Sequence, residues 1–213
     1  MADNISKNTF ENILKYKLSG KVNYLLDCQV DENEPYHSFL SLKNERFLDL
    51  GAYNGDTVLG FVEKCFDYDA ILAFEPDKKT FKKLLNNTEN LRNFTPINAC
   101  VSDRCETVSF KMLGGRNSVL GDGKDEITAV TIDSLNFNPT YIKMDVEGEE
   151  IAAITGGKQT ILENKPKMLI SAYHRTDDFV TIPKAVLEIR SDYKIYLRHF
   201  KYLPAWDTNF YFI

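Results

Sequence analysis

The feature that most constrains the fold is a regular alternation of apolar runs and amphipathic segments across residues 46–102. Residues 56–66 carry apolar side chains at helical spacing, and residues 78–91 do the same with lysines on the other face. Strand, helix, strand, helix, strand predicts a parallel sheet covered by helices on both faces. The three predicted strands are RFLDL (46–50), AILAFEP (70–76) and TPINACVS (95–102).

The rest of the chain extends this α/β pattern. ETVSFKM and EITAVTI flank a glycine-rich stretch and predict a hairpin insertion at about residues 105–132. TYIKMD and KMLISAY return to the parallel pattern, and YKIYLRHF with TNFYFI predicts a terminal antiparallel hairpin. We therefore expect an N-terminal helical segment and linker over residues 1–45, followed by one ligand-binding domain over residues 46–213.

Composition narrows the class of protein. The chain has 213 residues, 43% of them hydrophobic, and a net charge of −5, which argues against a nucleic-acid-binding surface. The four cysteines form no CxxC pair, so we expect reduced thiols in a cytoplasmic protein. The first residues lack a signal-peptide pattern, and no apolar run is long enough for a membrane span.

Ligands bind beyond the carboxyl ends of the strands in open parallel sheets. All the loops at that predicted edge contain polar or acidic residues. They are DLGAYNGD (49–56), EPD (75–77), VSDR (101–104), DVEGEE (145–150) and YHRTDD (173–178).

The loop DLGAYNGD predicts a tight turn, because Gly51 and Gly55 allow close backbone approach to a ligand. It is neither GxGxxG nor a P-loop. Asp49 and Asp56 would repel a pyrophosphate but suit an ammonium group, and Glu75 can accept hydrogen bonds from both hydroxyls of a ribose. The alternative is an ordinary turn in which Asp56 caps a helix.

An adenosine-like ligand with a cationic amino-acid end fits these residues, and S-adenosylmethionine is the common one. We expect its ribose at Glu75, its adenine at 101–103 and its ammonium group at Asp49. The expected cofactor-binding residues are Asp49, Gly51, Ala52, Tyr53, Asn54, Gly55, Glu75, Pro76, Val101, Ser102, Asp103 and Asp145.

The sequence resembles the FkbM-type methyltransferases, a branch of the class I S-adenosylmethionine-dependent enzymes. The resemblance spans roughly residues 46–200 and rests on FLDLGAYNGDTV, FEPD, NACVSD, TIDSL, YIKMDVEGEE and ISAYH, in that order. It implies a Rossmann-like sheet of about seven strands with the last strand antiparallel. It also implies O-methylation, typically of a hydroxyl group on a sugar, glycan or small metabolite.

Candidate catalytic residues follow two predicted strands. Asp145 is expected to hold the sulfonium end of the cofactor or to receive a proton, and His174 to act as general base. His174 has an alternative as a strand-end histidine bonded to solvent. Glu147 is expected to contact substrate, whereas Glu149 and Glu150 suit the first turn of a helix. A divalent metal on Asp145 and Glu147 lacks a third ligand in the sequence, so we expect none.

The glycine-rich insertion is expected to be either a lid or a surface hairpin. As a lid, it would turn Arg116, Asn117 and Ser118 toward the substrate. Arg175 would then join Arg116 in binding phosphates if the acceptor were a nucleotide sugar.

Three other classes stay open. A nicotinamide-dependent oxidoreductase shares the sheet and the ribose carboxylate, but it would want GxGxxG and a pyrophosphate where this chain has Asp56. A non-catalytic cofactor-binding module would keep Gly51 and Glu75 without needing Asp145 and His174. An RNA methyltransferase would want a basic stripe, which the sequence does not show.

Overall fold

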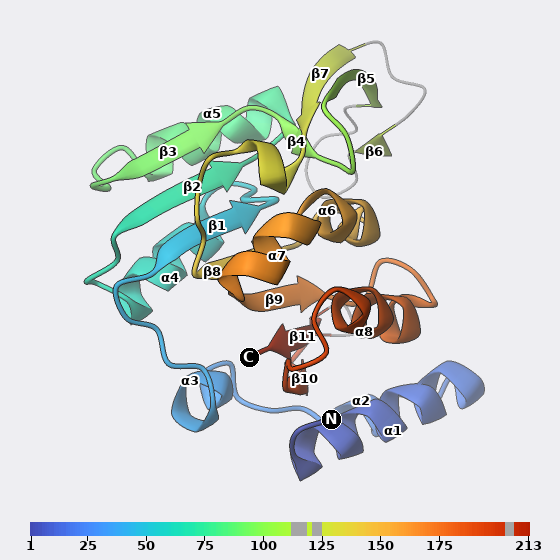
Figure 1. Cartoon of the computed structure of the whole chain (residues 1–213). Coiled ribbons are helices and arrows are strands. Elements are labelled where there is room, and N and C mark those ends of the chain that lie inside the picture. The colour runs from blue at the N-terminus through green and yellow to red at the C-terminus, as the bar shows by residue number, and fades with distance from the viewer. Residues whose placement is uncertain (112–118, 121–124, 203–206) are drawn as a thin grey trace. The chain divides into compact units, whose positions relative to one another are not determined.

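The computed structural model describes residues 1–111, 119–120, 125–202 and 207–213 (Figure 1). The chain divides into two compact units. Unit 1 combines Met1–Ser41 with Lys167–Ile213, and unit 2 is Leu42–Pro166. The predicted division into residues 1–45 and 46–213 is a different one and stays a prediction.

The main part of unit 2 is a run of four parallel strands. Leu50, the last residue of β1, pairs with both Phe74 and Met144, so three of these strands end level with one another. Phe74 in turn pairs with Ile97. The order across the sheet is β8 (Tyr141–Met144), β1 (Arg46–Leu50), β2 (Ala70–Phe74) and β3 (Phe94–Ile97).

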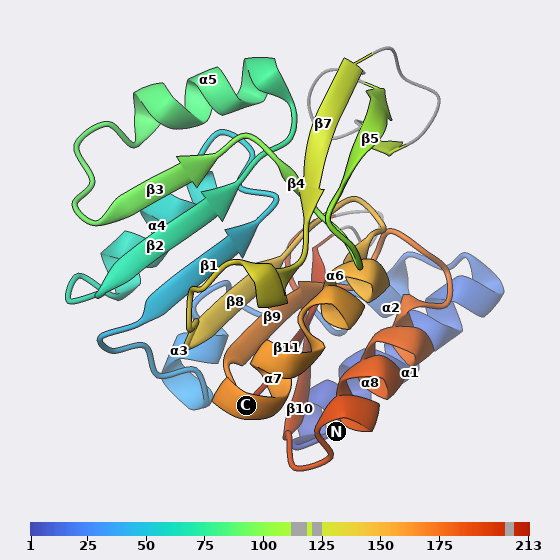
Figure 2. The same ribbon diagram turned by 45° about the horizontal axis from the view of Figure 1, so that its top comes forward.

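Two helices connect β1, β2 and β3 along the chain. α4 (Asp56–Lys64) buries Val58 and Phe61, and the Phe61 ring stacks on that of Phe47 at 4.2 Å between centroids. α5 (Lys78–Asn87) runs alongside β3 in Figure 2. Asp77 caps α5 by accepting from the backbone N–H groups of the first turn, which fixes where the helix begins.

A second, smaller sheet lies in unit 2. Its order is β4 (Cys100–Val101), β7 (Asp125–Val130), β5 (Glu106–Lys111) and β6 (Val119–Leu120), and β5 pairs antiparallel with β7. The sequence predicted one strand over residues 95–102, and that prediction is wrong. The side-chain amide of Asn98 donates to the carbonyls of Glu75 and Pro76, at 2.9 Å each, and the chain leaves the first sheet there.

Three short helices lie on either side of β8, where the chain returns to the first sheet after β7. η1 (Ile132–Ser134) precedes β8, and α6 (Glu150–Gly156) and α7 (Lys158–Asn164) follow it. The backbone N–H groups of Gln159 and Thr160 donate to the Asp133 carboxylate, which joins the start of α7 to η1.

Unit 1 carries three antiparallel strands in the order β10 (Ile195–His199), β11 (Thr208–Phe212) and β9 (Lys167–Ser171). Its buried core includes Phe179, Ile182, Leu197, Phe210 and Phe212. The helices of unit 1 are α1 (Asn4–Ser19), α2 (Asn23–Leu26), α3 (Glu34–Ser38) and α8 (Asp178–Ile189).

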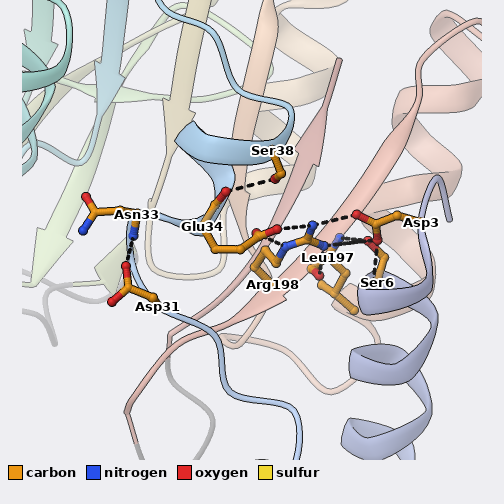
Figure 3. A network of polar contacts seen from close by, with 8 residues as sticks. All are labelled: Asp3, Ser6, Asp31, Asn33, Glu34, Ser38, Leu197 and Arg198. Carbon is orange, nitrogen blue, oxygen red and sulfur yellow. Dashed lines mark hydrogen bonds and ion pairs between the residues drawn. The ribbon is translucent and has the colours of Figure 1, made fainter.

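A buried arginine joins the N-terminal segment to β10 (Figure 3). Arg198 is 0% exposed, and its Nη2 donates to Asp3 Oδ2 at 2.6 Å and to Glu34 Oε1 at 3.0 Å. Its Nη1 donates to Ser6 Oγ at 2.9 Å and to the carbonyl of Leu197 at 3.0 Å. Two carboxylates from the first 41 residues therefore neutralise a charge inside unit 1.

The predicted fold class is confirmed. Counted over the described residues, β1, β2, β3, β8, β9, β10 and β11 are seven strands of a mixed α/β fold, mostly parallel and ending in an antiparallel hairpin. Across the same part of the chain, no helix is both long and apolar enough to cross a membrane.

Candidate functional site

The candidate site forms where three parallel strands of unit 2 end at the same level. Because Leu50 pairs with Phe74 and with Met144, the next residues along each chain segment share one edge of the sheet. These next residues are Gly51, Glu75 and Asp145. The structure thus brings together three loops that are far apart in the sequence.

The turn after β1 depends on its glycines. The backbone N–H groups of Gly51 and Ala52 both donate to the Phe74 carbonyl, at 3.0 and 2.8 Å. Gly51 has a φ of +82°, and a Cβ added there would lie 1.9 Å from the backbone oxygen of Asp145. Gly55 has a φ of +92° and precedes the first residue of α4. Both positions use the left-handed region that glycine tolerates best.

The middle of this turn also has an unusual backbone. Tyr53 is a non-glycine residue with a φ of +46°. Asn54 accepts from the backbone N–H of Asp56 through its side-chain oxygen at 3.2 Å, and its carbonyl accepts from Asn87 Nδ2 at 2.8 Å. Asn54 therefore stabilises the conformation of the turn through its side chain and through its backbone carbonyl.

Asp49 is directed into the protein. It is 0% exposed, its Oδ1 lies 3.2 Å from Lys143 Nζ, and its Oδ2 accepts from Thr57 Oγ1 at 2.9 Å. Lys143 Nζ also donates to the Gly51 carbonyl at 2.6 Å. Burial lowers the pKa of Lys143, but the carboxylates of Asp49 and Asp145 outweigh it, so the net pKa is raised. Lys143 is therefore a buried cation within the site.

Lys143 was not among the residues predicted for the site. The available signal was a lysine in the middle of the apolar run YIKM, where a buried strand position normally carries an apolar side chain.

Glu75 is a buried carboxylate that joins two loops. It is 7% exposed, and its Oε1 accepts from the backbone N–H of Asp77 at 2.8 Å. It also accepts from the backbone N–H of Tyr53. Burial raises the pKa of Glu75 to about 7, with the nearby Asp77 charge adding to the rise and Lys143 opposing it. Since a carboxylate has about four lone-pair positions, acceptor capacity remains for a ligand.

The acids of DVEGEE have different environments. Glu150 is 1% exposed, and its Oε1 accepts from the backbone N–H groups of Val146 at 3.1 Å and Gly148 at 3.4 Å. Glu147 has a left-handed backbone with a φ of +54°, and its side chain and that of Asp145 are partly exposed. Glu150 therefore shapes the loop, whereas Asp145 and Glu147 are accessible at its surface.

The predicted adenine segment, residues 101–103, also combines buried and exposed side chains. Val101 ends β4, and Ser102 lies close to α6, since a Cβ added to Gly156 would be 2.1 Å from the Ser102 carbonyl. Asp103 is exposed, and a hydrogen bond from Arg104 at 3.2 Å lowers its pKa. Ser102 is thus fixed by packing, and Asp103 faces solvent.

Two predicted residues belong to unit 1. His174 and Arg175 follow β9, and the ring centroids of Tyr173 and His174 are 4.2 Å apart. The backbone N–H of Arg175 donates to Asp178 Oδ2 at 2.7 Å. The predicted substrate residues Arg116, Asn117 and Ser118 lie outside the described residues.

The sequence from residue 49 to residue 203 matches the family described as Methyltransferase FkbM domain. No curated protein matches the chain. Among solved structures, a methyltransferase FkbM from Methylobacillus flagellatus KT superposes with a TM-score of 0.86 at 28% identity. The match covers 100% of this chain and 56% of that one, so this chain spans little more than half the length of that relative.

More distant structures share only the fold. A precorrin-6y C5,15-methyltransferase from Geobacter metallireducens GS-15 has a TM-score of 0.50 at 12% identity, with 80% of this chain and 79% of that chain covered. A ribosomal protein L11 methylase from Lactobacillus delbrueckii subsp. bulgaricus has a TM-score of 0.52 at 10% identity, with 84% and 72% covered. Fold does not by itself determine what a protein acts on.

Proposed function

Because the chain belongs to the FkbM methyltransferase family, we propose that it transfers a methyl group from S-adenosylmethionine to a hydroxyl group of a sugar, glycan or small metabolite. The observation that carries the proposal is the level ending of β1, β2 and β8. It gathers a glycine turn, a buried carboxylate and the DVEGEE loop at one edge of unit 2.

The residues present fit an adenosine-like cofactor. Glu75 accepts two backbone N–H groups and keeps acceptor capacity for the two hydroxyls of a ribose. A buried carboxylate with a raised pKa is costly to the fold, which favours a role in a binding site. In the proposal Gly51, Ala52, Glu75 and Ser102 hold the cofactor, while Asp49 supports the turn from inside rather than contacting the ammonium group.

When bound, S-adenosylmethionine would supply a methyl group already activated on a sulfonium centre. The chain then has to bind, orient and deprotonate the acceptor. We assign proton removal from the acceptor hydroxyl to His174, whose ordinary pKa lies near neutrality. Asp145 supplies a negative charge beside the turn, where it favours a cationic group.

The acceptor is proposed to be neutral or cationic. The partly exposed carboxylates of Asp145 and Glu147 can accept hydrogen bonds from sugar hydroxyls. A negative edge concentrates cations and repels polyanions, so a nucleic acid is disfavoured. If the acceptor is a nucleotide sugar, Arg175 is the proposed phosphate contact. The described cysteines are all free thiols, which fits the proposed cytoplasmic setting.

A nicotinamide-dependent oxidoreductase is the second candidate, because Glu75 would bind the ribose of NAD equally well. Asp56 disfavours it. This residue opens α4, its side chain is exposed, and a carboxylate there opposes a pyrophosphate at the helix N-terminus. A non-catalytic cofactor-binding module would bind S-adenosylmethionine without turnover.

Methyl transfer from labelled S-adenosylmethionine separates these functions. The panel contains neutral glycans, nucleotide sugars, small polyhydroxylated metabolites and RNA. We expect labelling of a hydroxyl compound and none of RNA. RNA labelling that falls steeply with added salt would overturn the choice of acceptor, since phosphate contacts release counterions. Binding without transfer to any class would favour the non-catalytic alternative.

A further inference from the structure

We propose that Lys143 is a positioning residue of the cofactor site, which holds the glycine turn after β1 in its binding form through its hydrogen bond to the Gly51 carbonyl. This inference rests on the proposed S-adenosylmethionine site, but it concerns a residue outside the set expected to touch the cofactor. Lys143 lies directly opposite Asp49 in the parallel pairing of β8 with β1.

The fold alone gives little reason for a lysine at this position. Lys143 is 5% exposed and Asp49 is 0% exposed, so both charges are removed from water. A buried ion pair is often no more stabilising than a pair of apolar side chains of similar volume. Neighbouring strand residues are apolar and fully buried, including Ile142 and Met144. A buried ion pair at this strand position is better explained by the other contact of Lys143, outside the pair itself.

The other contact of Lys143 is its hydrogen bond to the carbonyl of Gly51. Lys143 Nζ donates to it at 2.6 Å, whereas the Phe74 carbonyl accepts from the N–H groups of Gly51 and Ala52 on the other side of the turn. The peptide between Gly51 and Ala52 is therefore fixed from β8 and from β2 at once. Because φ at Gly51 is +82°, this peptide leaves the strand in a direction that few residues adopt.

Lys143 also acts on Glu75 through its charge. Burial raises the pKa of Glu75 to about 7, against the lowering effect of hydrogen bonds from the backbone N–H groups of Asp77 and Tyr53. The Asp77 charge adds to the rise, and the Lys143 charge opposes it. Loss of the Lys143 charge would raise that pKa further, so less Glu75 would be ionised at neutral pH to accept from ribose hydroxyls.

The test compares Lys143→Met with Thr57→Val. Methionine keeps the length and volume of the lysine stem and removes its donors. Thr57→Val removes the other hydrogen bond to Asp49 and leaves the Gly51 contact in place, so it is the matched control for damage to the buried network. Calorimetric titration with S-adenosylmethionine is repeated from pH 6 to pH 9, and thermal melts report stability.

We expect Lys143→Met to lose about tenfold or more in affinity at pH 8, as a lost charge-assisted hydrogen bond predicts. The pH midpoint of binding, near pH 7 in the wild type, should move upward. Thr57→Val should lower the melting temperature while keeping the affinity within about twofold and the midpoint unchanged. Lys143→Arg should restore part of the affinity because it keeps the charge.

A second variant covers the case in which Lys143→Met does not fold. Asp49→Asn/Lys143→Met removes both buried charges, and it should still bind weakly because the Gly51 carbonyl has no donor. Wild-type affinity in either variant overturns the inference alone. The same holds if affinity falls in Thr57→Val as far as in Lys143→Met. Absence of binding by the wild type would overturn the proposed function as well.

Discussion

A Cβ built on Gly51 would lie 1.9 Å from the backbone oxygen of Asp145. The turn after β1 and the loop after β8 therefore approach each other where there is room for a hydrogen atom and nothing larger. The approach is backbone to backbone, so no side-chain rotation relieves it. Both ends of this contact belong to the proposed cofactor site, which makes its geometry sensitive to a single methyl group.

Gly51→Ala should therefore destabilise unit 2 by on the order of 3 kcal/mol, from a left-handed backbone and a backbone clash together. We expect S-adenosylmethionine binding to be lost as well, because relief of the clash displaces the turn. Chemical denaturation and calorimetry measure the two effects. Gly60→Ala is the matched control: it lies in α4, nothing lies within 4 Å of its added Cβ, and it should stabilise by up to about 1 kcal/mol. A Gly51→Ala protein as stable as the wild type would contradict the geometry.

Glu75 should make stability depend on pH. Burial raises its pKa from 4.5 to about 7, so between these values the folded protein holds a proton that the unfolded chain releases. Stability therefore falls as the pH rises through this window, and the full penalty is present above about pH 7. Glu75→Gln should be more stable than the wild type at pH 8, by about 2 to 3 kcal/mol, and this advantage should vanish below pH 4.5.

Denaturant unfolding at pH 4, 6 and 8 checks this prediction. Equal differences between Glu75→Gln and the wild type at all three pH values would show that Glu75 is not responsible. Glu89→Gln serves as the control, because Glu89 is an exposed carboxylate of the same unit.

Arg198→Met should destabilise unit 1 by about 3 to 5 kcal/mol, because Asp3 and Glu34 lose the cation that neutralises them. The affected segment includes α1, so limited proteolysis should cut within the first residues of the chain sooner than in the wild type. Lys201→Met, an exposed substitution near the same strand, should leave both measurements unchanged. Wild-type resistance to proteolysis in Arg198→Met would show that other contacts hold α1.

His174→Ala should slow methyl transfer by about 10²–10⁴-fold if His174 is the general base. Its affinity for S-adenosylmethionine should stay near that of the wild type, because the role concerns the acceptor proton. Asp145→Asn should also slow turnover while leaving the fold intact. Turnover of His174→Ala near the wild-type rate would show that His174 is not the general base.

Much of unit 2 was predictable because several local signals agree. The runs at β1 and β2 are short and apolar, the spacing in α4 is helical, and Asp77 caps α5 where the sequence changes character. The split between β3 and β4 was missed, because it depends on Asn98 reaching carbonyls of a loop more than 20 residues earlier. A contact of that kind has no local pattern.

The site shows the same limit. Topology predicted that the loops after β1, β2 and β8 share an edge, but not which way each carboxylate faces. Asp49 turns inward to Lys143. Glu150 turns inward to the backbone N–H groups of Val146 and Gly148. Those directions depend on the register of β8 against β1 and on a left-handed residue at Glu147, neither of which the sequence shows directly.

The assignment of this site to S-adenosylmethionine is decided by calorimetric titration of the cofactor into the wild type and Glu75→Gln at pH 8, with NAD as the competing ligand. We expect the wild type to bind S-adenosylmethionine and not NAD. We also expect Glu75→Gln, though at least as stable, to bind about 10- to 100-fold more weakly, as loss of hydrogen bonds to a charged acceptor requires. Unchanged affinity in Glu75→Gln, or preferential binding of NAD by the wild type, would contradict the assignment.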